Sequence, residues 1–405
     1  MEKIEDQRQI AHIRNLFLLV YLVSYLTRIN YGAVITEMSD TTSMTRSALS
    51  LALTGSFITY GCGQLISGVA GDRLSPKKCV FFGLALSSSM NFLIPLCSGA
   101  AQMTLVWSVN GFAQAFIWPP MTKLLSGLLT QDSYKTVCSR VCWGASLGTI
   151  LVYLIAPVLM KLLRWKAVFL FSGICGVATT IQWSHKCPEY AHQTAAPVSD
   201  RKEKTGSHRL ISPLILALMV AIMLQGMLRD GITTWMPSYV AEVYHLDNYL
   251  SVLINVILPV FGIVCLELST RLYRFHIKNP VTCAAFFFCL GTVASAALVF
   301  LPEQNAGVAV LCAAVLKGSM HGVNLMLVSM IPLYFQKIGK VSTMSGILNS
   351  CGYVGSALSS YGIAALADRF GWGVNLVSWL MVSALGSGLC LLSIRPWQKQ
   401  YMDQQ

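Results

Sequence analysis

Long apolar runs, each about as long as a membrane-crossing helix, recur along the whole chain. A spanning helix needs about 20 mainly apolar residues. Runs of that kind lie at residues 14–36, 49–70, 79–97, 102–125, 137–160, 165–184, 212–236, 249–270, 281–302, 307–334, 342–366 and 371–394. Several carry glycine, as in GQLISGVAG (63–71) and GYVGSALSSYG (352–362), which is typical of closely packed membrane helices. The pattern predicts an all-α polytopic membrane protein with twelve transmembrane helices.

The composition supports a membrane protein and excludes several other classes. Of the 405 residues, 55% are hydrophobic and 11% are charged, whereas soluble domains are typically about 25% charged. The 13 cysteines are scattered singly and form no C-x-x-C pair. That spacing indicates small packing residues in a reduced setting, with neither a disulfide framework nor a metal site. We expect no cofactor.

The positive charges predict how the chain is oriented in the membrane. If both termini share one side, 20 lysines and arginines fall on that side and five fall on the other. The positive-inside rule then makes both termini cytoplasmic, together with Cys187 at the start of the polar segment 185–210. The net charge of +12 is spread over short loops that face anionic lipid, and no nucleic-acid motif accompanies it.

The polar segment divides the predicted helices into two equal sets. We expect an N-terminal six-helix half at 1–184, a cytoplasmic linker at 185–210 and a C-terminal six-helix half at 211–405. Two such halves related by a pseudo-two-fold axis place a substrate site near the middle of the membrane between them. This is the architecture of the major facilitator superfamily.

Two arginines lie well inside predicted helices, where each costs roughly 2.5 to 3.5 kcal/mol. Arg28 is in the first helix and Arg229 is in the seventh, which are equivalent positions of the two halves. Pseudo-symmetry would place them on opposing walls of one cavity, where two guanidinium groups can hold a tetrahedral anion. The alternative is that each forms a structural ion pair. Asp230 is adjacent to Arg229, and adjacent helical residues do not face each other, although Asp230 could pair with another helix.

Other polar residues within the predicted helices are weaker candidates. Lys317, His321 and Asn324 stand at i, i+4 and i+7, so they share one face of the tenth helix and either contact substrate or bond to a neighbouring helix. Aromatic and amide side chains can line the cavity or serve as plain interhelical contacts, and this group is Tyr31, Tyr60 and Asn349. Lys123 is expected to extend to the interface, and Glu267 to pair with Arg271 one turn on.

The loop after the second helix carries a recognisable motif. GVAGDRLSPKK (68–78) is similar to the superfamily signature G-x-x-x-D-R-x-G-R followed by R or K, with Ser75 and Pro76 replacing its second Gly and Arg. The matching residues are Gly68, Asp72, Arg73 and Lys77. Their chemistry suits a gate, because the glycine permits close helix contact and the aspartate can accept backbone N–H groups at a helix N-terminus. The cations are expected to hold the cytoplasmic side together.

Four further stretches narrow the resemblance to one family. YLTRINYG (25–32), YGCGQLISGVAGDRLSPKK (60–78), NGFAQAFIWPP (110–120) and LRDGITTWMPSY (228–239) resemble the organophosphate:phosphate antiporters, which include glycerol-3-phosphate and hexose-6-phosphate carriers. The resemblance covers nearly the whole chain, and it implies that Arg28 and Arg229 hold the substrate phosphate. It also implies a bacterial inner-membrane protein, which we expect to be a monomer.

Two departures from that family bear on the substrate. Gln64 stands where the family has a lysine, and residues 141–157 contain no histidine. If position 64 faces the cavity, the neutral amide lowers its positive charge. The substrate would then be a phosphate monoanion, or an ester whose remaining charge meets Lys317. A plain hydrogen bond from Gln64 to an adjacent helix is the alternative.

The sequence leaves three functions open. It contains no Walker A loop and no metal-spaced histidines, so we expect a secondary transporter and not an enzyme or an ATP-driven pump. The first function is exchange of a phosphate ester for inorganic phosphate by alternating access. The second is proton-coupled transport of another organic anion, with Asp230 or His321 as the titrating group. The third is a transporter-like sugar-phosphate sensor.

Overall fold

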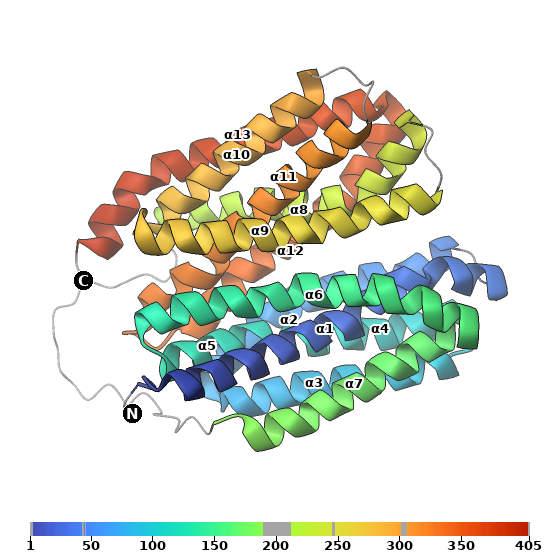
Figure 1. Cartoon of the computed structure of the whole chain (residues 1–405), viewed down its shortest axis with the longest axis horizontal. Helices are drawn as coiled ribbons and strands as arrows, with labels where there is room; N and C mark the ends of the chain where they lie inside the picture. The colour runs from blue at the N-terminus through green and yellow to red at the C-terminus, as the bar shows by residue number, and fades with distance from the viewer. Residues whose placement is uncertain are drawn as a thin grey trace.

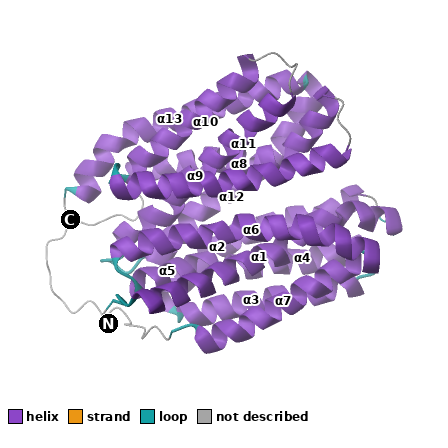
Figure 2. Cartoon of the chain, viewed as in Figure 1, coloured by secondary structure: helices purple, strands orange, loops and turns teal. Residues whose placement is uncertain are grey.

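The computed structural model describes residues 3–42, 44, 46–188, 212–244, 248–300 and 306–403. Within these ranges the regular structure is helical (Figure 2), apart from an isolated bridge between Ile4 and Leu129. Most of the predicted linker lies outside the described residues. The division at 185–210 therefore stays a prediction.

The N-terminal helices form one bundle, coloured blue to green in Figure 1. It consists of α1 (Gln7–Thr41), α2 (Arg46–Arg73), α3 (Pro76–Leu93), α4 (Ala100–Ala115), α5 (Trp118–Leu128), α6 (Gln131–Leu163) and α7 (Trp165–Lys186). A short 3₁₀ turn at Ile94–Leu96 extends α3.

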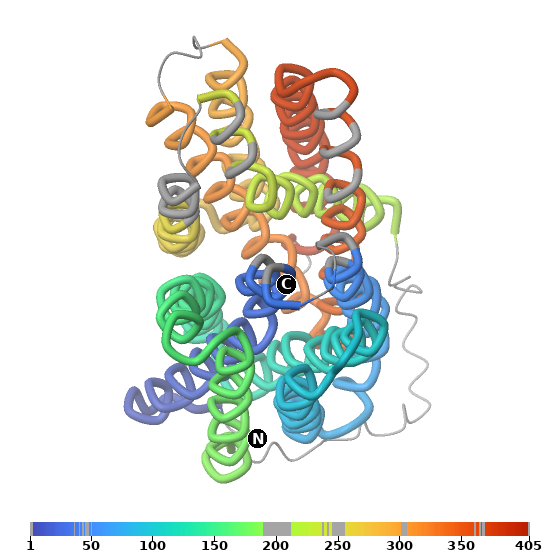
Figure 3. The backbone as a smooth tube through the Cα atoms, turned by 90° about the vertical axis from the view of Figure 1, so that its right-hand side faces the viewer, coloured from blue at the N-terminus to red at the C-terminus, as the bar shows by residue number. Residues whose placement is uncertain are grey.

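The C-terminal helices form a second bundle, coloured yellow-green to red. It consists of α8 (Pro213–Tyr244), α9 (Asn248–Phe275), α10 (Pro280–Phe300), α11 (Ala306–Asn324), α12 (Val341–Phe370) and α13 (Trp372–Trp397). A π-helical segment (Leu325–Met330) and a 3₁₀ segment (Ile331–Phe335) continue α11, and a further π-helical turn (Gln398–Met402) continues α13. Figure 3 shows the two bundles lying one above the other. They are in contact along a seam formed mainly by α2, α5 and α6 on one side and α9 and α12 on the other.

The fourth predicted helix, 102–125, is wrong as a single element, because the chain forms α4 and α5 there. Pro119 and Pro120 open α5, and a proline has no N–H to donate to the carbonyl four residues earlier. The Ala115 carbonyl, which Pro119 would otherwise have bonded, instead accepts from Ser67 Oγ at 2.7 Å and from Gln64 Nε2 at 3.4 Å. The break therefore ties α4 to α2.

Nine segments of the described chain are long and apolar enough to span a membrane. Neither α2 nor α12 is among them, although both are 28 residues or longer. Both are rich in glycine and serine, which lowers their hydropathy and lets backbones approach closely. These two helices pack against each other across the two bundles. The all-α membrane fold is confirmed, and twelve crossings are consistent with it.

Glycines make the α2–α12 contact possible. A Cβ atom on Gly68 would lie 2.9 Å from the Ser342 carbonyl oxygen, and one on Gly346 would lie 2.3 Å from the Gln64 carbonyl oxygen. Side chains at either position would force the two backbones apart. Further contacts between the bundles join α6 to α9, α6 to the segment Leu325–Met330, and α5 to α12.

An aspartate caps the seam where α12 begins. Asp72 accepts from the backbone N–H groups of Ser342 at 3.1 Å and Thr343 at 2.7 Å, as the motif predicted. Lys123 Nζ lies 3.3 Å from Asp72 Oδ1 and donates to the Gly339 carbonyl at 3.2 Å. A carboxylate at a helix N-terminus is stabilised both by the N–H groups and by the helix dipole. Residues from both bundles thus meet at one charged group.

The cation in this contact differs from the one expected. Lys123 was expected to extend to the interface, but it reaches across the seam instead. Within the described chain, Arg73 and Lys77 of the motif make no ion pair. Arg73 is exposed. Lys123 can take the role because it lies on α5, which packs against α12.

The charge pattern and the exposure of the α7 end give a topology prediction. Cys187 is buried, and burial raises the pKa of its thiol to about 12, so its labelling would report accessibility as much as sidedness. His185 and Ser98 are both exposed, at opposite predicted sides of the membrane. In a cysteine-free chain, we expect an impermeant thiol reagent added to intact cells to label Ser98→Cys and to spare His185→Cys. The reverse result would overturn the orientation.

The capped seam gives a second prediction. Asp72→Asn removes the charge that holds Lys123 and the α12 N-terminus, and a hydrogen bond to a charged group contributes about 1.5 kcal/mol or more. We expect the labelling rate of Thr343→Cys in the purified protein to rise by roughly ten-fold in the Asp72→Asn background. Asp132→Asn is the matched control, because Asp132 pairs only locally with Lys135. Equal labelling rates in all three backgrounds would contradict a role for Asp72 in closing this end.

Candidate anion-binding site

Arg28 of α1 is surrounded by tyrosines. Its Nη1 donates to the Tyr353 hydroxyl at 3.1 Å. Its guanidinium carbon lies 4.3 Å from the ring centroid of Tyr25 and 5.1 Å from that of Tyr60. Aromatic faces attract cations, and the attraction grows when the pair is removed from water. No carboxylate among the described residues pairs with Arg28.

Arg229 of α8 is held by hydrogen bonds. Its Nε and Nη2 donate to the two carboxylate oxygens of Asp230, each at 2.8 Å, and its Nη1 donates to Asn324 Oδ1 of α11 at 3.2 Å. The expectation that adjacent residues would not pair is therefore wrong here. The long arginine stem bends back to bring the guanidinium beside the carboxylate of the next residue. Asp230 also accepts from the Ser356 hydroxyl of α12.

Tyr353 of α12 brings the two arginines together. Its hydroxyl bonds to Arg28, and its ring centroid lies 5.6 Å from the Arg229 guanidinium carbon. Sequence reasoning missed both Tyr353 and Ser356. A signal was present, because Asn349, Tyr353 and Ser356 stand at i, i+4 and i+7, the spacing that singled out the polar face of α11.

A buried amide network fixes the part of α1 that carries Arg28. The Thr27 carbonyl accepts from Asn91 Nδ2 at 3.0 Å and from Asn110 Nδ2 at 3.1 Å. The Thr27 hydroxyl accepts from Gln114 Nε2 at 2.8 Å. These donors come from α3 and α4, so two neighbouring helices hold the turn before Arg28. In hydrocarbon surroundings such polar groups persist only when they are satisfied, as these are.

The three polar residues of α11 take different positions. Asn324 bonds to Arg229, as described above. Lys317 is 5% exposed and lies near enough to Asp230 and Arg229 for their charges to interact, yet its ammonium makes no ion pair or hydrogen bond within the described chain. His321 faces α9, where a Cβ atom on Gly262 would lie 3.5 Å from its Nε2.

Of the two predicted residues on α2, Tyr60 lies beside the arginines and Gln64 joins α2 to α12. Tyr60 joins the site, with its ring 4.3 Å from that of Tyr353. Gln64 is fully buried, and its Oε1 accepts from Asn349 Nδ2 at 3.1 Å while its Nε2 faces the Ala115 carbonyl. In this conformation Gln64 joins α2 to α12, which is the alternative given for it above. Its effect on substrate charge stays a prediction.

Tyr31 lies away from the arginines. Its hydroxyl donates to the Leu49 carbonyl at 3.2 Å, and its ring lies 5.0 Å from Trp107 in the apolar core of the first bundle. A residue three positions after Arg28 is rotated by about 60° around the helix axis, and here that rotation turns it into the core. The expectation that Tyr31 lines the cavity is therefore not met.

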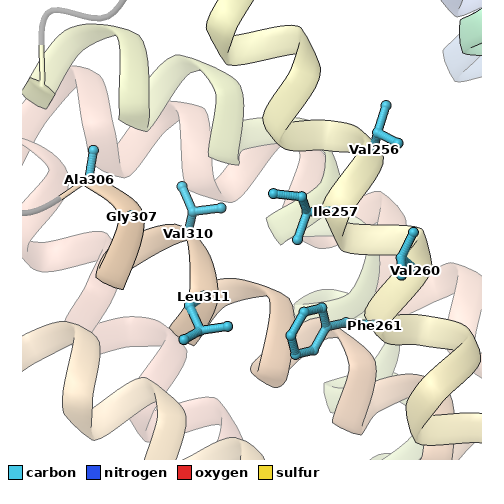
Figure 4. Close-up of a pocket in the computed structure, with 8 residues that line it drawn as sticks. All are labelled: Val256, Ile257, Val260, Phe261, Ala306, Gly307, Val310 and Leu311. Atoms are coloured by element: carbon cyan, nitrogen blue, oxygen red, sulfur yellow. The ribbon is translucent and has the colours of Figure 1, made fainter.

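The charges around Tyr353 do not balance. Arg28, Arg229 and Lys317 are cations, and Asp230 is the carboxylate among the described residues near them, so the cluster carries an excess of two positive charges. A separate groove of about 710 Å³ between α9 and α11 is lined by apolar residues and carries no charged side chain (Figure 4). Its lining residues are Val256, Ile257, Val260, Phe261, Ala306, Gly307, Val310 and Leu311. The described chain has no cluster of metal-ligating residues.

Known proteins with similar sequences include a glycerol-3-phosphate transporter and two membrane sensor proteins. The chain is 22% identical over 432 residues to the glycerol-3-phosphate transporter of Bacillus subtilis, covering 97% of this chain and 94% of that protein. It is 21% identical over 413 residues to the membrane sensor protein UhpC of Escherichia coli, covering 95% and 91%. With UhpC of Salmonella typhimurium, identity is 23% over 255 residues and the match spans 58% of each chain. These relatives confirm the resemblance to the organophosphate:phosphate antiporters.

A family model and a solved structure agree on the fold. The structure of the proton:xylose symporter XylE superposes with a TM-score of 0.74 at 13% identity, covering 97% of this chain and 96% of that one. The model described as Major Facilitator Superfamily matches residues 17–360, most of the chain. The family and fold are those of transporters and not of enzymes. The chain belongs to the Major Facilitator Superfamily.

Proposed function

We propose that the chain is a secondary transporter of a small organic anion that carries a phosphate group, and that it exchanges this anion for inorganic phosphate. The phosphate would bind between Arg28 and Arg229 beside Tyr353. The observation that carries the proposal is the excess of two positive charges around that tyrosine. A phosphate ester supplies up to two negative charges, and buried charge is costly unless it is paired.

The hydrogen-bond donors of the arginines support the same assignment. A guanidinium has five N–H groups. Arg229 directs three of its nitrogens at Asp230 and Asn324, which leaves two N–H groups, while Arg28 uses one for Tyr353 and keeps four. Tetrahedral oxyanions are well matched to such paired donors. The site therefore has spare donors as well as spare charge.

The contact between the bundles suits alternating access. The described bonds between the bundles run from the Arg28–Tyr353 pair towards the end where Asp72 meets α12. The proposed site would thus lie at the end of the closed seam that is farthest from Asp72. Transport would require this seam to open while the opposite end closes around the site. We place the protein in the bacterial inner membrane with both termini cytoplasmic, in line with its bacterial relatives and charge pattern.

A sensor is the second candidate, because two relatives are named membrane sensor proteins. A sensor and a carrier can share one phosphate site and differ in whether substrate crosses the membrane. Uptake of labelled glycerol-3-phosphate and glucose-6-phosphate into proteoliposomes separates the two. We expect uptake only when the vesicles hold inorganic phosphate. Binding without uptake would indicate a sensor, and uptake driven by a proton gradient alone would indicate proton coupling through Asp230 or His321.

The arginine pair gives the third prediction. Arg28→Lys and Arg229→Lys keep a positive charge but lose the two-pronged donor geometry, so each should lower exchange by about ten-fold or more while the protein remains folded. Arg395→Lys is the matched control, because Arg395 is exposed on α13. Exchange is measured in phosphate-loaded proteoliposomes. Near-normal uptake by either site variant would disprove the paired-arginine site.

Lys317 gives the fourth prediction, in which stability and function change in opposite directions. Replacing an unpaired buried cation by an apolar side chain removes a desolvation cost, so Lys317→Met should raise the melting temperature of the substrate-free protein. If Lys317 supplies charge to the site, the same variant should bind phosphate about ten-fold more weakly, a loss of about 1.4 kcal/mol. Unchanged competition by inorganic phosphate would exclude Lys317 from the site.

A further inference from the structure

A second group of arginines lies at another contact between the bundles, where α6 meets α9. A small pocket of about 110 Å³ opens there, away from the central site. Its lining combines three arginines with one carboxylate, three hydroxyls and one phenyl ring: Arg140, Arg271, Arg274, Glu267, Thr136, Ser139, Thr270 and Phe275. We refer to these eight residues as the seam pocket. Neither the exchange reaction nor the Asp72 cap uses them.

The seam pocket carries excess positive charge. Glu267 is shared between Arg271 at 3.0 Å and Arg140 at 3.7 Å, and the first of these is the local pair that the sequence predicted. Arg274 forms no ion pair within the described chain, and its guanidinium carbon lies 5.3 Å from the Phe275 ring centroid. One carboxylate thus faces three cations. An anion with two or more acceptor oxygens would balance the excess positive charge and accept hydrogen bonds from the arginines.

The seam pocket joins the two bundles. Thr270 of α9 donates a hydrogen bond to Ser139 of α6, and Arg140 of α6 faces Glu267 of α9. Its contributing residues lie at the end of the seam that also holds Asp72, because α6 begins at Gln131 and α9 ends at Phe275. A ligand held by arginines from both helices would link the bundles. Such a ligand would stabilise the closed form of this end.

The surface of α9 beside the seam pocket is apolar and exposed. Val260, Val264 and Leu268 are 43%, 55% and 42% exposed and stand four residues apart, so they form one stripe along the helix. The stripe runs into Arg271, whose side chain is 70% exposed, and Phe275, which is 71% exposed. From Val260 to Leu268 the helix rises about 12 Å, close to the hydrocarbon depth of one leaflet at about 15 Å.

We propose that the seam pocket binds the phosphate group of an anionic phospholipid whose acyl chains lie along the α9 stripe. Arg274 and Arg140 hold the phosphate from the two bundles, and the bound lipid favours the closed seam. Soluble phosphate offers the same oxygens to the arginines. The apolar stripe continuous with the pocket is what favours a lipid, because a free ion would gain nothing from it.

Thermal unfolding of the full chain in a neutral detergent tests the proposal. We expect phosphatidylglycerol to raise the melting temperature and phosphatidylcholine, which has no net charge, to have little effect. In Arg274→Gln, the phosphatidylglycerol concentration for half the shift should rise about five-fold, the effect of one basic residue at a membrane surface. This variant breaks no ion pair, so its basal stability should match the parent. Arg395→Gln is the matched control and should respond like the parent.

Three results would overturn the proposal. The first is an equal phosphatidylglycerol response in Arg274→Gln and the parent. The second is an equal effect of phosphatidylcholine, which would assign the shift to acyl chains alone. The third is an equal effect of inorganic phosphate at the same concentration, which would assign the pocket to a soluble anion. Native mass spectra provide an independent check, because Arg274→Gln should retain less phosphatidylglycerol than Arg395→Gln. The exchange activity of both variants is measured separately.

Discussion

Positive charge buried in the membrane region without an equal negative charge is the constraint on which the centre of this protein depends. Among the described residues, the cations Arg28, Arg229 and Lys317 lie around one carboxylate, Asp230, which forms its ion pair with Arg229. The protein tolerates them by surrounding Arg28 with tyrosine rings and by fixing Arg229 with hydrogen bonds. Neither device removes the excess charge, so the substrate-free site is not at its electrostatic optimum. An anion improves it, which links occupancy to the stability of the whole membrane region.

The rest of the architecture serves to hold that charge between two bundles that meet at one end. Glycines at positions 68 and 346 bring the α2 and α12 backbones together, and Asp72 caps α12 from the other bundle. Small residues at this seam lower the hydropathy of the two helices that form it. The small residues that lower the hydropathy of α2 and α12 also let the two helices pack closely without large interlocking side chains. Such a contact can open during transport.

The sequence was sufficient for the fold and named part of the candidate site. Apolar run lengths predicted the helices, and intramembrane charge singled out Arg28 and Arg229, whose role in binding stays a prediction. The α4–α5 break was missed because Pro119 and Pro120 were counted within one apolar run. Tyr353 was missed because a tyrosine carries no charge, and its place between the arginines depends on how α12 crosses the other bundle. The Arg229–Asp230 pair was missed because helix geometry constrains backbones, whereas a long side chain can turn back on itself.

The site is divided unequally between the two bundles. Arg229, Asp230, Asn324, Ser356 and Tyr353 all belong to the C-terminal bundle, and their mutual bonds lie within it. The N-terminal bundle contributes Arg28 and the rings of Tyr25 and Tyr60. Among the described residues, the hydrogen bond from Arg28 to Tyr353 and the contact between the Tyr60 and Tyr353 rings join these three residues to that group. When the bundles rock apart, the five-residue group can move as one rigid unit. A bound substrate would then stay with the C-terminal bundle, and the loss of its contact with Arg28 would weaken its binding.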